Sequence, residues 1–138
     1  MSLPCLSAQV PRDFPTTETL VREALAAEGF GVLTEIDVKA TLRDKLGEEM
    51  EDYRILGVCN PSLAHQALQV DRSVGLLLPC TVVIRGSQTL GVTTVEAQDP
   101  TVMVELTGVF ALQPIADDAS ARLDRALASL PIGPLDAR

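Results

Sequence analysis

The sequence predicts an α+β domain, with a mostly antiparallel sheet of about five strands and helices packed on one face. Segments that alternate apolar and polar residues interleave with segments whose apolar residues recur every three or four positions. The strand segments follow one another closely, with short helices inserted between them, which favours antiparallel or mixed pairing. Capping residues followed by proline mark two of the helix starts.

The first half of the chain predicts two strands and two helices. Residues 6–10 alternate apolar and polar side chains, as a half-buried strand does. An amphipathic helix is expected over 17–28, with a threonine at its start as the cap and Gly29 as its left-handed stop. Residues 30–36 are rich in β-forming types, and the segment 37–47 predicts a short helix that its first aspartate caps.

The middle of the chain predicts three further strands. Residues 53–59 form the first of them, and Asn60 and Pro61 then start a helix, with the asparagine as cap and the proline at the first helical position. Residues 74–84 are apolar on both alternating sets, so we expect a central strand covered on both faces, in part by a partner subunit. Residues 89–97 are expected to be its hairpin partner.

The last third predicts two helices. Asp99 and Pro100 repeat the cap and proline pattern before a short helix that ends at Gly108. A longer amphipathic helix is expected over about 116–130, followed by a short proline-rich tail. Because no repeat or linker interrupts this order, residues 1–138 are expected to form a single domain.

The composition argues against several classes of partner. Nineteen Asp and Glu against eleven Lys and Arg give a formal charge of −8, which repels nucleic acid and anionic membranes. With aromatic residues at 3%, platforms for stacking bases or sugars are not expected. The sequence has no apolar run of membrane-spanning length and no signal-peptide pattern at its start, and its three cysteines form no CxxC pair. We therefore expect a soluble, cytoplasmic protein.

Three blocks of sequence resemble one known family. EGFGVLTEIDVKATLRDKLG, EDYRILGVCNPSLAHQAL and VGLLLPCTVVI are similar, in this order, to the family of domain of unknown function 302, over about residues 14–107. The resemblance implies a compact domain of β-α-β(4)-α order, similar in topology to TATA-box-binding-protein-like folds and often dimeric. It implies no activity, and DNA binding does not follow from the fold because this chain is acidic. The first strand, CLSAQV, is weaker than the one typical of the family.

Cys59 is the sharpest chemical signal in the sequence. It lies where a strand passes into a capped helix, and free helix amides near a sulfur lower the pKa of the thiol. The competing interpretation, which we favour, is that Cys59 is a small buried apolar residue at the joint between two packed elements.

Two other residues extend the chemical hypothesis. Cys80 follows Pro79, where a bulge could direct its side chain into a cleft, although its apolar neighbours favour burial. If Cys59 and Cys80 face each other, they would form a redox pair or two soft metal ligands, and His65 would be a third ligand or a base. Because no fourth ligand or paired spacing accompanies them, the sequence does not favour a metal.

Two functions remain open from the sequence. The favoured one is a homodimeric, non-enzymatic module without a cofactor, which binds a small ligand or a protein partner. The alternative is a thiol-dependent redox or soft-metal-binding protein that uses Cys59, Cys80 and His65. The acidic segment 48–52 is interpreted as a solvated turn and not as a catalytic pair, and neither a phosphate loop nor a nucleophile elbow is present.

Overall fold

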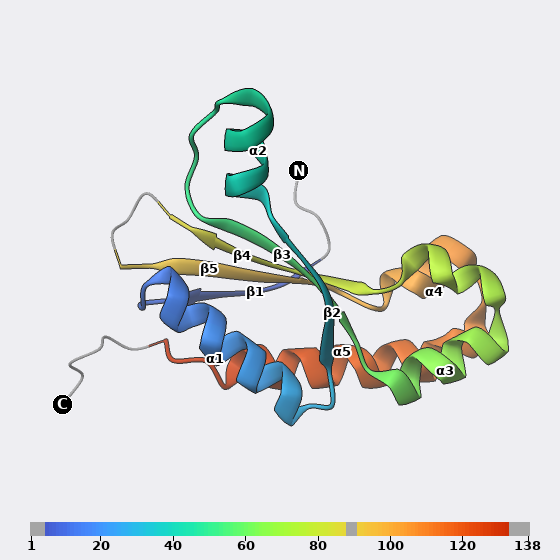
Figure 1. The fold of residues 1–138 in the computed structure, drawn as a ribbon. Helices are drawn as coiled ribbons and strands as arrows, with labels where there is room; N and C mark the ends of the chain where they lie inside the picture. Colours follow the sequence, from blue (N-terminus) through green and yellow to red (C-terminus); the bar gives the residue numbers. More distant parts are fainter. Residues whose placement is uncertain (1–4, 88–90, 133–138) are drawn as a thin grey trace.

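The structure, a computed structural model, describes residues 5–87 and 91–132 (Figure 1). Within these ranges strands (β), α-helices (α) and 3-10 segments (η) alternate along the chain. The elements are β1 Cys5–Val10, α1 Phe14–Ala27, β2 Gly31–Asp37, α2 Val38–Leu46, β3 Tyr53–Cys59, α3 Pro61–Val70, η1 Arg72–Leu77, β4 Cys80–Gly86, β5 Thr93–Gln98, α4 Val102–Thr107, η2 Phe110–Leu112 and α5 Gln113–Ala128.

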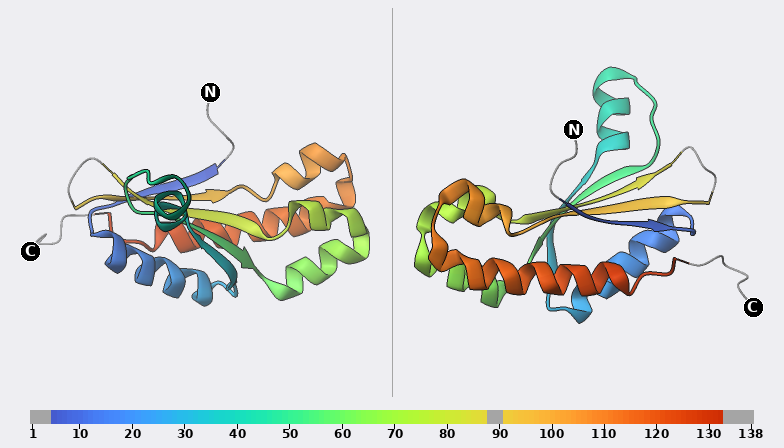
Figure 2. Two further views of the ribbon diagram at one scale, coloured as in Figure 1. Left: turned by 45° about the horizontal axis from the view of Figure 1, so that its top comes forward. Right: turned by 180° about the vertical axis from the view of Figure 1, so that it is seen from behind.

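The described strands form one five-stranded sheet in the order β1-β5-β4-β3-β2, and every neighbouring pair is antiparallel. Helices α1 and α5 lie against one face of this sheet, while α2 projects away from the opposite side (Figures 1 and 2). The α+β fold with helices packed on one face is therefore confirmed. When the short helices are set aside, the chain order is β-α-β-β-β-β-α.

The core consists of two clusters. The first lies between the sheet and the helices α1 and α5. The second joins α3, η1, α4, η2 and the start of α5 into a helical lobe at one end of the sheet (Figure 1). Both are built from aliphatic side chains, as the low aromatic content requires. Fully buried members of the first cluster include Val10, Leu56, Val58, Val82, Ile84, Val95, Ala97 and Leu123.

Helix α1 begins earlier than predicted. It starts at Phe14, and the carboxylate of Asp13 accepts a hydrogen bond from the backbone amide of Thr16 at 2.9 Å, so the aspartate and not a threonine is the cap. Pro15 occupies the first turn, where no amide donor is missed. The helix stops as predicted at Gly29, whose φ of 87° is in the left-handed region that favours glycine.

The strand predicted over 74–84 is wrong in its first half. Residues 72–77 form the 3-10 segment η1, and the carboxylate of Asp71 accepts a hydrogen bond from the amide of Ser73 at 2.9 Å at its start. An apolar run alone does not distinguish a short helix from a strand. The remaining part, β4, is the middle strand of the sheet, as predicted.

Two other boundaries differ from the prediction. Helix α5 begins at Gln113, three residues before the expected start, because Pro114 fits the first turn of a helix, where no amide donor is needed. The predicted hairpin partner over 89–97 begins in a stretch, 88–90, that lies outside the described residues, and β5 itself runs over Thr93–Gln98. Most of the predicted tail also lies outside them.

The sheet face opposite α1 and α5, which we call the open face, carries an apolar row. Ile36 of β2 is paired with Ile55 of β3, and Ile55 is paired with Val83 of β4. Ile36 is 49% exposed, and Ile55 and Val83 are half-buried. On the same face Gly57 leaves space for its neighbours, because a Cβ atom there would meet the Thr34 hydroxyl and lie 2.8 Å from Cγ of Pro79.

Strand β2 is one of the two outer strands of the described sheet. Its pairing with β3 is interrupted by a register shift between Val32 and Thr34, so Leu33 bulges out and is 64% exposed. None of the helices in the described ranges is long and apolar enough to cross a lipid bilayer.

Candidate functional site

Asn60 holds the joint between β3 and α3 together. Its side-chain oxygen accepts a hydrogen bond from the Leu63 amide at 3.3 Å, which confirms the predicted cap. Its amide nitrogen donates to the Glu28 carbonyl at 3.4 Å, and Arg122 of α5 donates to the same carbonyl at 3.2 Å. The end of α1, the start of α3 and the face of α5 are therefore connected at one point.

Loss of this cap should be measurable. We expect Asn60→Ala to lower the free energy of unfolding by about 0.5–2 kcal/mol, because one amide of the first turn of α3 and the Glu28 carbonyl lose a partner. Urea denaturation followed by circular dichroism would measure the difference. Gln69→Ala, at an exposed position of the same helix, serves as the control and should change stability by less than about 0.5 kcal/mol. Equal effects of the two substitutions would show that Asn60 has no special role.

Cys59 and Cys80 lie close together at this joint. Cys80 is paired with Val58, the residue before Cys59. Both cysteines line one small cavity of about 20 Å³, enough for about one water molecule, at the junction of the two core clusters. The described residues that line it are Phe30, Val58, Cys59, Asn60, Leu63, Ala64, Ala67, Leu78, Cys80, Met103, Ile115 and Ala119.

The surroundings of these thiols favour their protonated forms. Burial raises the pKa of Cys59. Burial, and to a smaller extent the neighbouring Cys59, raise the pKa of Cys80 to about 11. For Cys59 this direction, which is caused by desolvation, is opposite to that expected for a thiolate stabilised by helix amides. Neither thiol is therefore prepared as a fast nucleophile at neutral pH.

The third residue of the hypothesis lies elsewhere. His65 is exposed on α3 and does not line the cavity. In the described part of the chain, no group of three or more His, Cys, Asp and Glu residues is arranged to hold a metal ion. The structure thus brings Cys59 and Cys80 together but does not join His65 to them. Cys5 is exposed on β1, and all three cysteines are free thiols.

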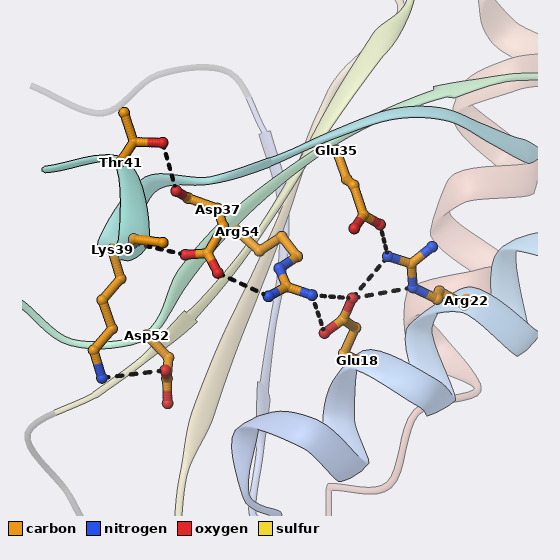
Figure 3. Close-up of polar contacts among 9 residues, drawn as sticks. Glu18, Arg22, Glu35, Asp37, Lys39, Thr41, Asp52 and Arg54 are labelled. Carbon is orange, nitrogen blue, oxygen red and sulfur yellow. Dashed lines mark hydrogen bonds and ion pairs between the residues drawn. The ribbon is translucent and has the colours of Figure 1, made fainter. Parts of the chain in front are cut away.

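A charged cluster that the sequence alone did not reveal lies between α1 and the strands β2 and β3 (Figure 3). Glu18 of α1 accepts hydrogen bonds from Arg54 of β3 at 3.0 Å and from Arg22, one turn further along α1, at 2.7 Å. Arg22 also contacts Glu35, and Arg54 donates to Asp37 at 3.1 Å. The Glu18 side chain is only 14% exposed. The cluster therefore ties α1 to β2 and β3.

The sequence did contain a signal for this cluster. Arg54 precedes Leu56 and Val58 at alternate positions, so it points to the helix-covered face of the sheet, where a charged side chain needs partners. Glu35 and Asp37 also alternate on one strand. Their positions opposite Leu56 and Arg54 depend on the pairing of β2 with β3, which the sequence does not display.

The chemistry of this cluster is that of a structural clamp. Asp37 caps α2, and the hydrogen bond from the Ala40 amide, with a smaller effect of Arg54, lowers the pKa of its carboxyl group. The Arg54 guanidinium also lies over the Phe14 ring, 5.8 Å from its centre. With its pKa lowered, the carboxyl group of Asp37 is a poor general acid, since it carries no proton to transfer near neutral pH.

Comparison with known proteins agrees with the fold. A family model described as domain of unknown function DUF302 matches residues 6–130, a longer stretch than the 14–107 identified from the sequence. The chain is similar to an uncharacterized conserved DUF302 protein from Bacillus stearothermophilus, whose crystal structure superimposes with a TM-score of 0.84 at 31% identity, covering 92% of this chain and 98% of that one. No curated protein matches this chain. The chain therefore belongs to the DUF302 family.

Proposed function

We propose that this protein is a homodimeric, non-enzymatic binding module in which a second copy of the chain covers the open face of the sheet. The observation that carries the proposal is the apolar row Ile36, Ile55 and Val83, which crosses three adjacent strands on the face that α1 and α5 do not cover. Neighbouring apolar side chains on three strands form a continuous surface, and stacked sheets bury such surfaces against each other.

The charges beside the row suit a twin subunit. Arg85 and Glu96 form an ion pair at 3.0 Å on the open face, and Lys39 and Asp52 form another at 3.5 Å near the base of α2. Each pair is neutral as a unit, although the chain as a whole carries a formal charge of −8. Two copies can therefore approach each other through this face without electrostatic repulsion between these side chains, because each charge already has a partner of opposite sign in its own subunit.

Helix α2 supplies area that the sheet lacks. The three strands that carry the apolar row, spaced by about 4.8 Å and about 20 Å long, offer roughly 300 Å², less than half of what each partner buries in an ordinary interface. None of the residues of α2, all of which are described, is buried, and Leu46 at its end is 68% exposed. A nine-residue helix gains little stability on its own. Contact with a second copy would bury α2 and complete the interface.

Sedimentation equilibrium tests the proposal. At about tens of micromolar we expect the wild type to be a dimer, and Ile55→Asp and Val83→Lys to shift it to a monomer, because each places a charge in the apolar row. Leu76→Asp is the matched control, since Leu76 is 89% exposed but lies in the helical lobe, and it should leave the dimer intact.

Circular dichroism of each variant separates loss of assembly from loss of folding. A folded monomer for Ile55→Asp or Val83→Lys, with a dimeric Leu76→Asp, supports the proposal. A strictly monomeric wild type overturns it. A dimer that persists in folded Ile55→Asp and Val83→Lys overturns it as well, because the interface would then lie elsewhere.

A further inference from the structure

The two cysteines at the β3–α3 joint are spaced for a covalent link. Paired Cα atoms of antiparallel strands lie about 4.5–5.5 Å apart, and consecutive Cα atoms lie about 3.8 Å apart. Because Cys80 is paired with Val58, the Cα atoms of Cys59 and Cys80 are expected to lie about 6 Å apart, within the range of disulfides. Both residues line the same cavity at the end of β3, and the neighbouring Cys59 contributes to the raised pKa of Cys80.

We propose that Cys59 and Cys80 form a dithiol site that small-molecule disulfides oxidise to an intramolecular disulfide. The site is independent of the proposed dimer, since it lies at the junction with the helical lobe and not in the apolar row of the open face. The chemical class of its substrate is a low-molecular-weight disulfide such as oxidised glutathione. This compound is the oxidant, and the two protein thiols are the reductant.

The reaction has two balanced exchange steps. In the first, the Cys59 thiolate attacks one sulfur of the small disulfide, forms a mixed disulfide and releases one small thiol. In the second, the Cys80 thiolate attacks the Cys59 sulfur and releases the second small thiol. Each protein thiol loses one proton, which the released thiolates take up. The sum is one protein disulfide and two small thiols from two protein thiols and one small disulfide.

Burial assigns the order of the two steps. Cys59 is half-buried at the end of β3, so a small disulfide can reach it from solvent. Cys80 is only 8% exposed and faces the cavity, so it meets a disulfide only after Cys59 has formed one. Cys59 is therefore the entry thiol and Cys80 the resolving thiol.

The second step should depend steeply on pH. The described residues that line the cavity come from β3, α3, α4, α5 and the segments beside β2 and β4. Of these residues, only the two cysteines have side chains that titrate. A charged side chain does reach the joint from α5: Arg122 donates to the Glu28 carbonyl that also accepts from Asn60. Since the pKa of Cys80 is about 11, the resolving rate should rise about tenfold for each pH unit between 7 and 9.

The experiment uses the full chain and oxidised glutathione. Intact mass, peptide mapping and thiol counts after unfolding follow the reaction in the wild type, Cys5→Ser, Cys59→Ser and Cys80→Ala. In the wild type and in Cys5→Ser, we expect a glutathione adduct on Cys59 that converts to a disulfide between Cys59 and Cys80. In Cys80→Ala the adduct should persist, and in Cys59→Ser the thiol of Cys80 should remain free.

The proposal fails if the adduct on Cys59 persists in the folded wild type at pH 9 as it does in Cys80→Ala, or if the disulfide forms only in denaturant. It also fails if Cys5→Ser abolishes the oxidation, because the link would then involve Cys5. Ile55→Asp, the variant designed to break the dimer, should oxidise like the wild type. The two proposals can therefore fail separately.

Discussion

Replacing Leu56 with alanine is expected to lower the free energy of unfolding by about 2–5 kcal/mol, and replacing its neighbour Ile55 by only about 1 kcal/mol in the monomer. Leu56 is fully buried between the sheet and its helices, so its loss leaves a cavity. Ile55 faces the open side of the same strand, where water can fill the space that the side chain leaves.

Urea denaturation at micromolar and at higher protein concentration measures both effects. If a second copy covers Ile55, the cost of Ile55→Ala should grow with concentration, while that of Leu56→Ala should change less, because unfolding is then coupled to dissociation. Equal costs of the two substitutions at the lowest concentration would contradict the one-sided packing of the sheet.

The second large effect concerns Glu18, which is placed between two arginines. We expect Glu18→Ala to destabilise the protein by about 1–3 kcal/mol, since the Arg54 guanidinium loses its least exposed carboxylate partner and keeps the more exposed Asp37 and the Phe14 ring. Arg125→Ala, which removes the more exposed pair with Glu28, is the control and should cost less than about 1 kcal/mol. Chemical denaturation at low and high salt would compare them.

A double variant separates the interaction energy between Glu18 and Arg54 from the cost of leaving the Arg54 guanidinium without that partner. Glu18→Ala combined with Arg54→Met should cost less than the sum of the single substitutions, because no partly buried guanidinium is then left without Glu18. Strict additivity would mean that the two side chains do not interact in the folded protein, contrary to the 3.0 Å contact.

The sequence was sufficient for features that depend on neighbouring residues. The caps at Asp37 and Asn60 and the stop at Gly29 involve a few consecutive positions, and the structure confirms all three. The order of strands and helices follows from the same local periodicities. The start of β4 was missed because residues 74–77 are apolar in a short helix as they would be in a strand.

The candidate sites could be predicted only in part. The sequence raises the hypothesis that Cys59 and Cys80 face each other, but their common cavity depends on the pairing of β3 with β4. The position of His65 outside that cavity depends on which side of α3 packs against the lobe. The contacts of Glu18 with Arg54 join residues 36 positions apart, a separation that no local pattern encodes.

The bulge at Leu33 also limits how this protein can aggregate. An outer strand with regularly spaced, unpaired backbone groups can form hydrogen bonds with a strand of another molecule. Repeated addition of strands in this way produces fibrils. In β2 the bulge disturbs that regularity, and Glu35 and Asp37 place carboxylates along the same strand. Strand addition at this edge is therefore disfavoured. In the dimer that we propose, each copy would cover the open face of the other, and a twofold interface of this kind leaves no equivalent surface for a third chain.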